Sequence, residues 1–107
     1  MQTDNQTLAA CVQWIFQLSV HPDIPNAERK QYDALGYRLR LRLVTLLSAK
    51  FDDGTPQVIA ANKKIKEVNA LLKKRLQGLQ GAAETVGAIG DLVSIIDDLF
   101  QLPFTFV

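Results

Sequence analysis

Residues 56–101, PQVIAANKKIKEVNALLKKRLQGLQGAAETVGAIGDLVSIIDDLFQ, decide the fold, because their apolar side chains recur at steps of three and four. Such steps place side chains on one face of an α-helix. Thr55 is a suitable N-cap, Pro56 a suitable first helical residue, and Pro103 marks the end. The sequence therefore predicts a helical segment of about 45 residues. Its apolar series is Val58, Ala61, Ile65, Val68, Leu72, Leu76, Leu79, Ala83, Val86, Ile89, Val93, Ile96 and Phe100.

The second half of this segment contains four glycines, Gly78, Gly81, Gly87 and Gly90, and leaves two structures open. Each glycine inside a helix costs about 1 kcal/mol relative to alanine, so a break near Gly78–Gly81, giving a four-helix bundle, is one of them. The other is a single continuous helix. We favour continuity, because the periodicity keeps its phase and neither a proline nor a good cap interrupts it.

A continuous helix of this length has a consequence for assembly. At 1.5 Å per residue the helix would be about 69 Å long, whereas a compact chain of this size has a radius of gyration of about 13 Å. The remaining helices would cover only one side of such a rod. Continuity therefore predicts a dimer or larger oligomer with a maximum dimension of at least about 70 Å.

Two further helices are predicted before this segment. Residues 4–20 begin at Thr3 or Asp4 as capping residue and are apolar around most of the helix, so we expect burial on more than one side. Residues 27–50 follow a connection that contains two prolines, with Asn26 as N-cap. Their inward side chains are expected to be Tyr32, Leu35, Leu39, Leu43, Leu46 and Leu47.

Residues 38–43, RLRLRL, alternate with a period of two, which is typical of a half-buried strand. We favour a helix, because a strand needs a partner and only residues 105–107 offer one. The predicted fold class is therefore all-α, an antiparallel helical bundle of three helices with a long C-terminal helix, or of four where that helix breaks. At 107 residues, the chain is expected to form one helical domain, residues 1–107.

The cellular location is inferred from features that the sequence lacks. Cys11 is the single cysteine, so no disulfide can form within the chain. Residues 1–7 lack the charged and apolar regions of a signal peptide, and no run of 18 uncharged apolar residues offers a membrane-spanning helix. We expect a cytoplasmic protein in a reducing environment.

The sequence also lacks the motifs of phosphate-binding, catalytic and metal-binding sites. Neither glycine-rich phosphate-binding pattern occurs, and Cys11 has no histidine nearby to activate it. Glu84, Asp91 and Asp98 recur every seven residues on one helix face, but successive members lie roughly 10 Å apart, which favours a solvated stripe over a metal site. The sequence predicts no enzyme activity, cofactor, metal or small-molecule substrate.

The charge is strongly segregated along the chain. All 12 cationic residues lie between Arg29 and Arg75, where residues 28–75 have a net charge of +7, while the N-terminal and C-terminal flanks carry −2 and −4. This basic middle is expected to meet either the acidic C-terminal half of the protein itself or an anionic partner. The candidate residues for an acidic partner or anionic surface are Arg38, Arg42, Lys66, Lys73 and Lys74.

A row of small residues gives the second functional candidate. Ala83, Gly87, Gly90 and Ser94 follow one another at steps of four, three and four, which would let another helix approach closely. The predicted function is a non-enzymatic helical interaction or assembly module that self-associates as a homo-oligomer (dimer) or packs against a helical protein partner. The alternative is binding to anionic surfaces, either membrane or nucleic acid, through the basic residues 29–75.

Overall fold

The computed structural model describes residues 1–107 and is predominantly helical, as the sequence predicted. No helix in it is both long enough and apolar enough to cross a membrane. The elements in chain order are α1 (Asn5–Ser19), α2 (Asn26–Leu46), β1 (Ala49–Lys50), α3 (Pro56–Leu76), α4 (Ala82–Leu99) and β2 (Thr105–Phe106).

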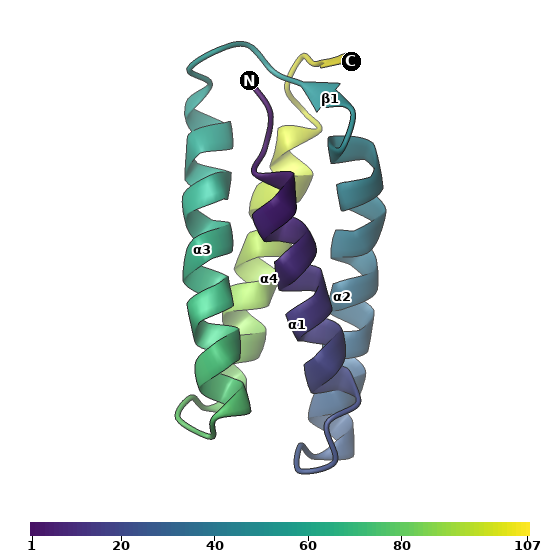
Figure 1. The fold of residues 1–107 in the computed structure, drawn as a ribbon, viewed down its shortest axis with the longest axis vertical. Coiled ribbons are helices and arrows are strands. Elements are labelled where there is room, and N and C mark those ends of the chain that lie inside the picture. Colours follow the sequence, from purple (N-terminus) through teal and green to yellow (C-terminus); the bar gives the residue numbers. More distant parts are fainter.

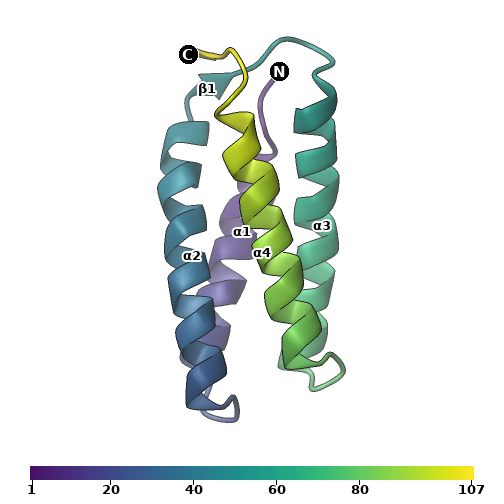
Figure 2. The same cartoon turned by 180° about the vertical axis from the view of Figure 1, so that it is seen from behind.

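The four helices stand side by side, and each runs opposite in direction to the helix before it in the chain (Figures 1 and 2). α1 packs against α2 and α3, and α4 packs against α2 and α3, so α1 lies diagonally opposite α4, and α2 opposite α3. The chain thus forms two helical hairpins, α1–α2 and α3–α4, and the connection between them crosses one end of the bundle (Figure 1). One consequence is that α2 and α4 are neighbours that run in the same direction (Figure 2).

The predicted continuous helix over residues 56–101 is wrong, because the chain turns back between Leu76 and Ala82. Gly78 has a φ of 75°, which is the left-handed conformation that glycine adopts without a Cβ penalty. The Leu79 N–H donates to the Lys74 carbonyl at 2.8 Å, and the Gly78 N–H donates to the Arg75 carbonyl at 3.0 Å. This pair of bonds is the Schellman motif, which ends helices without a side-chain cap.

The turn also removes the length argument for an oligomer. The chain measures 42 × 20 × 20 Å with a radius of gyration of 13.9 Å, close to the value of about 13 Å for a compact chain of this size. The expected dimension of at least about 70 Å is therefore wrong for the single chain. Any self-association must rest on a surface of the folded chain.

The buried face of α3 is the predicted one, and that of α4 differs from the prediction mainly in its first half. Leu79, which kept the apolar series in phase across the turn, is 73% exposed. Beyond it, predicted Ala83 is exposed and predicted Val86 is half-buried. From Ile89 onward the predicted series is confirmed, because Ile89, Val93 and Ile96 are buried, and further residues outside the series join them in the core. The buried residues of α4 are Thr85, Ala88, Ile89, Leu92, Val93, Ile96 and Leu99.

Residues 38–43 are helical, as favoured from the sequence. α2 nevertheless ends at Leu46, short of the predicted Lys50, and Leu47 is exposed and not inward. Ala49–Lys50 instead forms β1, which pairs antiparallel with β2. The C-terminal strand therefore pairs with residues 49–50, which follow the end of α2. It does not pair with the alternating residues 38–43.

A close approach between helices occurs at Gly36 of α2, not at the glycines of α4. A Cβ added at Gly36 would lie 3.0 Å from Cγ2 of Ile15 and 3.2 Å from Cε1 of Phe16, both on α1. Glycine at this position lets the first hairpin close tightly. A larger side chain would have to displace the core of α1.

Substitution by alanine is predicted to have opposite effects on stability at Gly78, which has a positive φ, and at Gly87, which lies within a helix. Gly78→Ala should lower the free energy of unfolding by about 1 kcal/mol, because alanine in the left-handed region is strained. Gly87→Ala should raise it by up to about 1 kcal/mol, because Gly87 is helical and an added Cβ meets no atom within 4 Å. Urea denaturation measures both variants. Stabilisation by Gly78→Ala would mean that the helix continues through this position.

Candidate interaction surfaces

The small-residue row of α4 faces outward. Ala83, Gly87 and Ser94 are exposed and Gly90 is half-buried. A Cβ added at Gly87 or Gly90 meets nothing within 4 Å, so no other helix of the chain packs over the row there. Close packing on these four residues therefore remains a prediction about another molecule.

The two predicted arginines are engaged within the chain. The Arg38 Nη2 donates to Asp97 Oδ2 at 3.1 Å, and the Arg42 Nε donates to Asp97 Oδ1 at 2.9 Å. The Arg42 guanidinium also lies 4.5 Å from the ring centroid of Phe100, a distance at which cation and aromatic face attract. These contacts join α2 to α4, so the acidic group that Arg38 and Arg42 meet belongs to the same protein.

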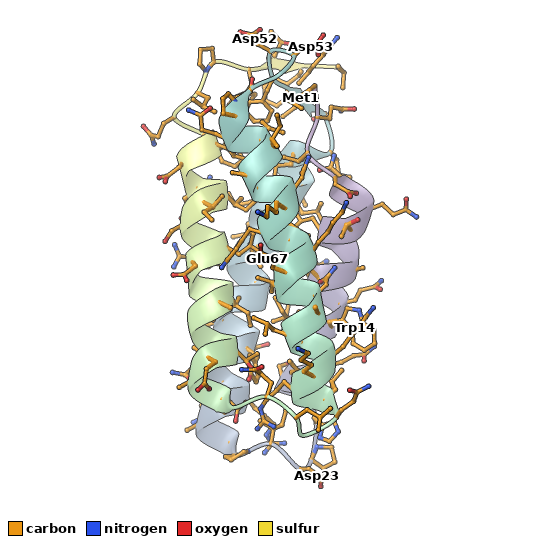
Figure 3. The ribbon with its side chains drawn as sticks, turned by 90° about the vertical axis from the view of Figure 1, so that its left-hand side faces the viewer. Met1, Trp14, Asp23, Asp52, Asp53 and Glu67 are labelled. Atoms are coloured by element: carbon orange, nitrogen blue, oxygen red, sulfur yellow. The ribbon has the colours of Figure 1, made fainter.

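The predicted lysines lie on the outer face of α3. Lys66, Lys73 and Lys74 are exposed, and no lysine of α3 takes part in an ion pair. Figure 3 looks onto this helix, with Glu67 midway along it and Trp14 on the neighbouring α1. Lys73 Nζ lies 5.9 Å from the Trp14 ring centroid. The acidic helix α4 thus leaves the charge of the α3 lysines unpaired.

The most prominent apolar surface of the molecule was not predicted from the sequence. Tyr37, Leu41, Val44 and Leu47 are 59%, 59%, 63% and 57% exposed. Their spacing of four, three and three residues places them along the outer side of α2, continuing past its end at Leu46. We call these four residues the α2 ridge. Other large exposed apolar residues, such as Ile59 on α3, do not form a comparable row on one helix.

The ridge was hidden in the sequence by the number of leucines in α2. A helix with apolar residues on two sides does not reveal which side faces the core. Leu47 was expected to point inward, and Leu41 was not among the side chains expected in the core. A helix wheel in which Tyr32, Leu39 and Leu46 define the buried side is the signal that could have located the ridge, since those three are fully buried.

Charge is distributed unevenly around the bundle. α1 has no charged residue, α2 has five cations and two acids, α3 has six cations and one acid, and α4 has four acids and no cation. Because α4 packs between α2 and α3, the acidic helix lies between two basic ones. Glu84, Asp91 and Asp98 of α4 are exposed and form no ion pair.

One charged cluster is buried. Glu28, in the first turn of α2, is 7% exposed and accepts hydrogen bonds from Arg75 Nε at 2.8 Å and Nη2 at 2.9 Å. The fully buried Tyr32 also donates its hydroxyl to Glu28. The Arg75 guanidinium lowers the pKa of the Glu28 carboxyl, which outweighs the opposite effect of burial, and the Tyr32 hydroxyl lowers it further. Every group is satisfied by the others, so the cluster holds α2 and α3 together.

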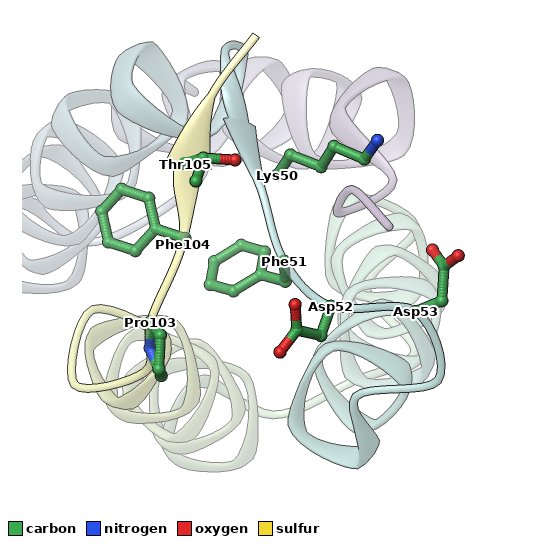
Figure 4. Close-up of a pocket in the computed structure, with 7 residues that line it drawn as sticks. All are labelled: Lys50, Phe51, Asp52, Asp53, Pro103, Phe104 and Thr105. Carbon is green, nitrogen blue, oxygen red and sulfur yellow. The ribbon is translucent and has the colours of Figure 1, made fainter.

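A pocket of about 340 Å³ lies at the end of the bundle that holds both termini (Figure 4). The Phe51 and Phe104 rings stand 5.5 Å apart at its centre. Asp52 and Asp53 line its rim, but their carboxylates point in different directions (Figure 4), and Asp53 accepts a hydrogen bond from the Met1 ammonium group at 3.0 Å. The pocket does not assemble a convergent set of reactive groups.

No group of three or more His, Cys, Asp or Glu side chains is placed to hold a metal ion. Cys11 is buried, and burial raises the pKa of its thiol to about 12, which makes it a poor nucleophile. Comparisons with protein-family models, curated proteins and solved structures find no match to the chain. The function must therefore be argued from its surfaces.

The buried cluster predicts a pH-dependent stability effect. Arg75→Ala should lower the free energy of unfolding by about 3 kcal/mol at pH 7, because Glu28 would keep a buried charge without its partner. The pKa of Glu28 is lowered in the folded state, so the stability that the pair contributes is present above the unfolded pKa and is lost as the pH falls. The difference from wild type should therefore shrink below about pH 4.

Urea denaturation from neutral to acidic pH measures this difference. Lys74→Ala is the control, because the neighbouring Lys74 is exposed and should change stability by no more than about 0.5 kcal/mol. A loss in Arg75→Ala that stays the same at every pH would show that Arg75 acts through packing alone.

Proposed function

We propose that this chain is a non-enzymatic helical interaction module that packs against another helix through the α2 ridge. The observation that carries the proposal is the exposure of four large apolar side chains in one row on a well-formed helix. Rows at steps of three and four are how one helix presents itself to another. The core is complete without them, so folding does not account for their apolar character.

The size of the ridge indicates what the partner must provide. Burying the exposed part of four such side chains contributes about 5 kcal/mol, at roughly 2 kcal/mol for each fully buried one. Association itself costs about 4 kcal/mol or more, so the ridge alone gives weak binding. A stable complex needs either charged contacts beside the ridge or a second apolar contact of the same kind.

A photo-crosslinking amino acid at position 41 tests the proposal in cells that express the protein. We expect an adduct of defined mass whose crosslinked peptide, identified by mass spectrometry, belongs to a helix of either the same protein or another one. The control places the same group at Ile59, which is similarly exposed at 53% but lies on α3. No adduct at position 41, or equal adducts at both positions, would refute the proposal.

A second candidate function is binding to anionic surfaces through α3. It is supported by one observation, the unpaired state of all five α3 lysines on a helix with six cations and one acid. Counter-ions released from phosphates drive such binding and make it sensitive to salt. The contribution of Arg38 and Arg42 to this function is reduced by their pairing with Asp97.

Charge reversal tests this second candidate. Reversing Lys66, Lys73 and Lys74 to glutamate should abolish binding to anionic lipid vesicles or duplex DNA at about 50 mM salt. The matched control reverses Lys30, Arg40 and Lys50, which changes the net charge equally away from α3. Equal loss in both triple variants would indicate a dependence on net charge only, and absence of wild-type binding would exclude the candidate.

A further inference from the structure

The α2 ridge borders the seam between α1 and α2, which pack against each other in the first hairpin (Figure 1). Phe16 of α1 lies against Gly36, so Gly36 marks the edge of α2 that faces α1. Arg38 pairs with Asp97 and marks the edge that faces α4. Successive residues of a helix are turned by about 100°, so Tyr37 lies between these two edges, on the outer side of α2. The rest of the ridge follows Tyr37 at helical steps.

An open groove of about 620 Å³ runs along α1 on the other side of this seam. Its lining residues are Gln13, Phe16, Gln17 and Val20, and we call it the α1 groove. Phe16 is half-buried where it meets α2, and Val20, directly after the end of α1, is 74% exposed. α1 has no charged residue. The seam is therefore flanked by exposed apolar side chains on both helices.

Unpaired cations lie on the same side of the hairpin. A second hollow, of about 420 Å³, shares Val20 with the α1 groove and is lined by Arg29 and Lys30. Lys30 is exposed, and the Nε of Arg29 is buried without an acceptor in the chain. Arg40, one turn beyond the closest approach to α1, is also exposed, and none of the three forms an ion pair. One exposed acid, Asp33, lies among them, so positive charge is in excess.

We propose that an acidic amphipathic helix of a different protein lies along the seam between α1 and α2 and covers both the α2 ridge and the α1 groove. The inference rests on the proposed function, because it names the chemical class of the helix that packs on the ridge. The apolar stripe of this helix packs between Phe16 and Tyr37, and acids on its flanks meet Lys30 and Arg40. The α1 groove thus supplies the second apolar contact, and the cations supply the charged contacts, that the ridge alone lacks.

The helices of this chain itself do not match that description. α2 and α3 are basic, and α1 is uncharged. α4 is acidic, but it exposes no large apolar side chain, and Ala83, Gly87 and Ser94 occupy its outer face. A helix that fills the α1 groove and covers the ridge needs large apolar residues as well as acids. Charge and side-chain size together therefore favour another protein over a second copy.

Two designed helical peptides of about 20 residues test the class of the partner. Both have leucines at steps of three and four, and the acidic peptide has glutamate at the flanking positions where the basic peptide has lysine. Fluorescence anisotropy of the dye-labelled peptides with the full chain measures both affinities. The acidic peptide should bind at least about tenfold more tightly. Its advantage should shrink as salt rises from about 50 to about 500 mM.

Variants of the full chain test the residues of the seam. Leu41→Gln should weaken binding of the acidic peptide about tenfold, because it removes a large apolar side chain from the contact. Lys30→Glu with Arg40→Glu should reverse the preference, so that the basic peptide binds more tightly. The matched control, Lys66→Glu with Lys73→Glu, makes the same change in net charge on α3 and should alter either affinity by no more than about twofold. All of these side chains are exposed, so the melting temperature should stay close to that of the wild type.

A photo-crosslinking group at the centre of the leucine stripe locates the bound peptide. We expect mass spectrometry to find adducts both on residues 13–20 of α1 and on residues 30–44 of α2. Adducts on α3 or α4, or on α2 without any on α1, would overturn the seam as the binding site.

The outcomes separate this inference from the proposed function. An acidic peptide that does not bind, or that binds no more tightly than the basic one, would overturn the acidic partner. A wild type with twice the chain mass in light scattering, which Leu41→Gln returns to one, would show that a second copy covers the ridge. In each case the photo-crosslink from position 41 in cells still decides the proposed function, because it depends on neither the charge nor the identity of the partner.

Discussion

The left-handed backbone at Gly78 is the constraint on which the remaining structure depends. A residue with a side chain adopts that conformation at a cost of about 1–2 kcal/mol, and here it lets the chain reverse between α3 and α4. The reversal lays the acidic helix back along α3 and against α2. The ion pairs of Asp97, the burial of α4 and the 42 Å length of the molecule all follow from it.

Once the chain has folded into two hairpins, polar contacts determine how these hairpins fit together. Apolar packing is non-directional, whereas the Asn62 and Asn69 side chains of α3 bond at 2.8 and 3.2 Å to the backbone at the start of α1. The pair of Glu28 and Arg75 joins the two basic helices α2 and α3, which lie diagonally opposite each other. Misaligned hairpins would leave these buried groups without partners, which is costly.

The sequence predicted the helical class and the buried face of α3, because its N-terminal Thr-Pro signal and its periodicity agree. It failed at the turn and at the start of α4, where Leu79 and Ala83 continue the series but are exposed, whereas Ile89, Val93 and Ile96 are buried as predicted. A Schellman turn needs only glycine and backbone bonds, so the missing side-chain cap near Gly81 was a poor argument for continuity. The α2 ridge could not be separated from the core by pattern alone, since Leu41 and Leu43 belong to the same alternating stretch.

In the folded chain, the segregated charges of the sequence mostly face solvent and do not neutralise one another. If the acids of α4 served to neutralise the neighbouring basic helices, they would face them, yet only Asp97 does so. Glu84, Asp91 and Asp98 point to solvent, as do Lys66, Lys73 and Lys74 on α3. Exposed ion pairs add little to stability in any case, so the layout affects the fold only slightly. Under the proposed function, its main effect would be on the orientation in which another molecule approaches the α2 ridge, since complementary charge steers encounters and excludes like-charged partners.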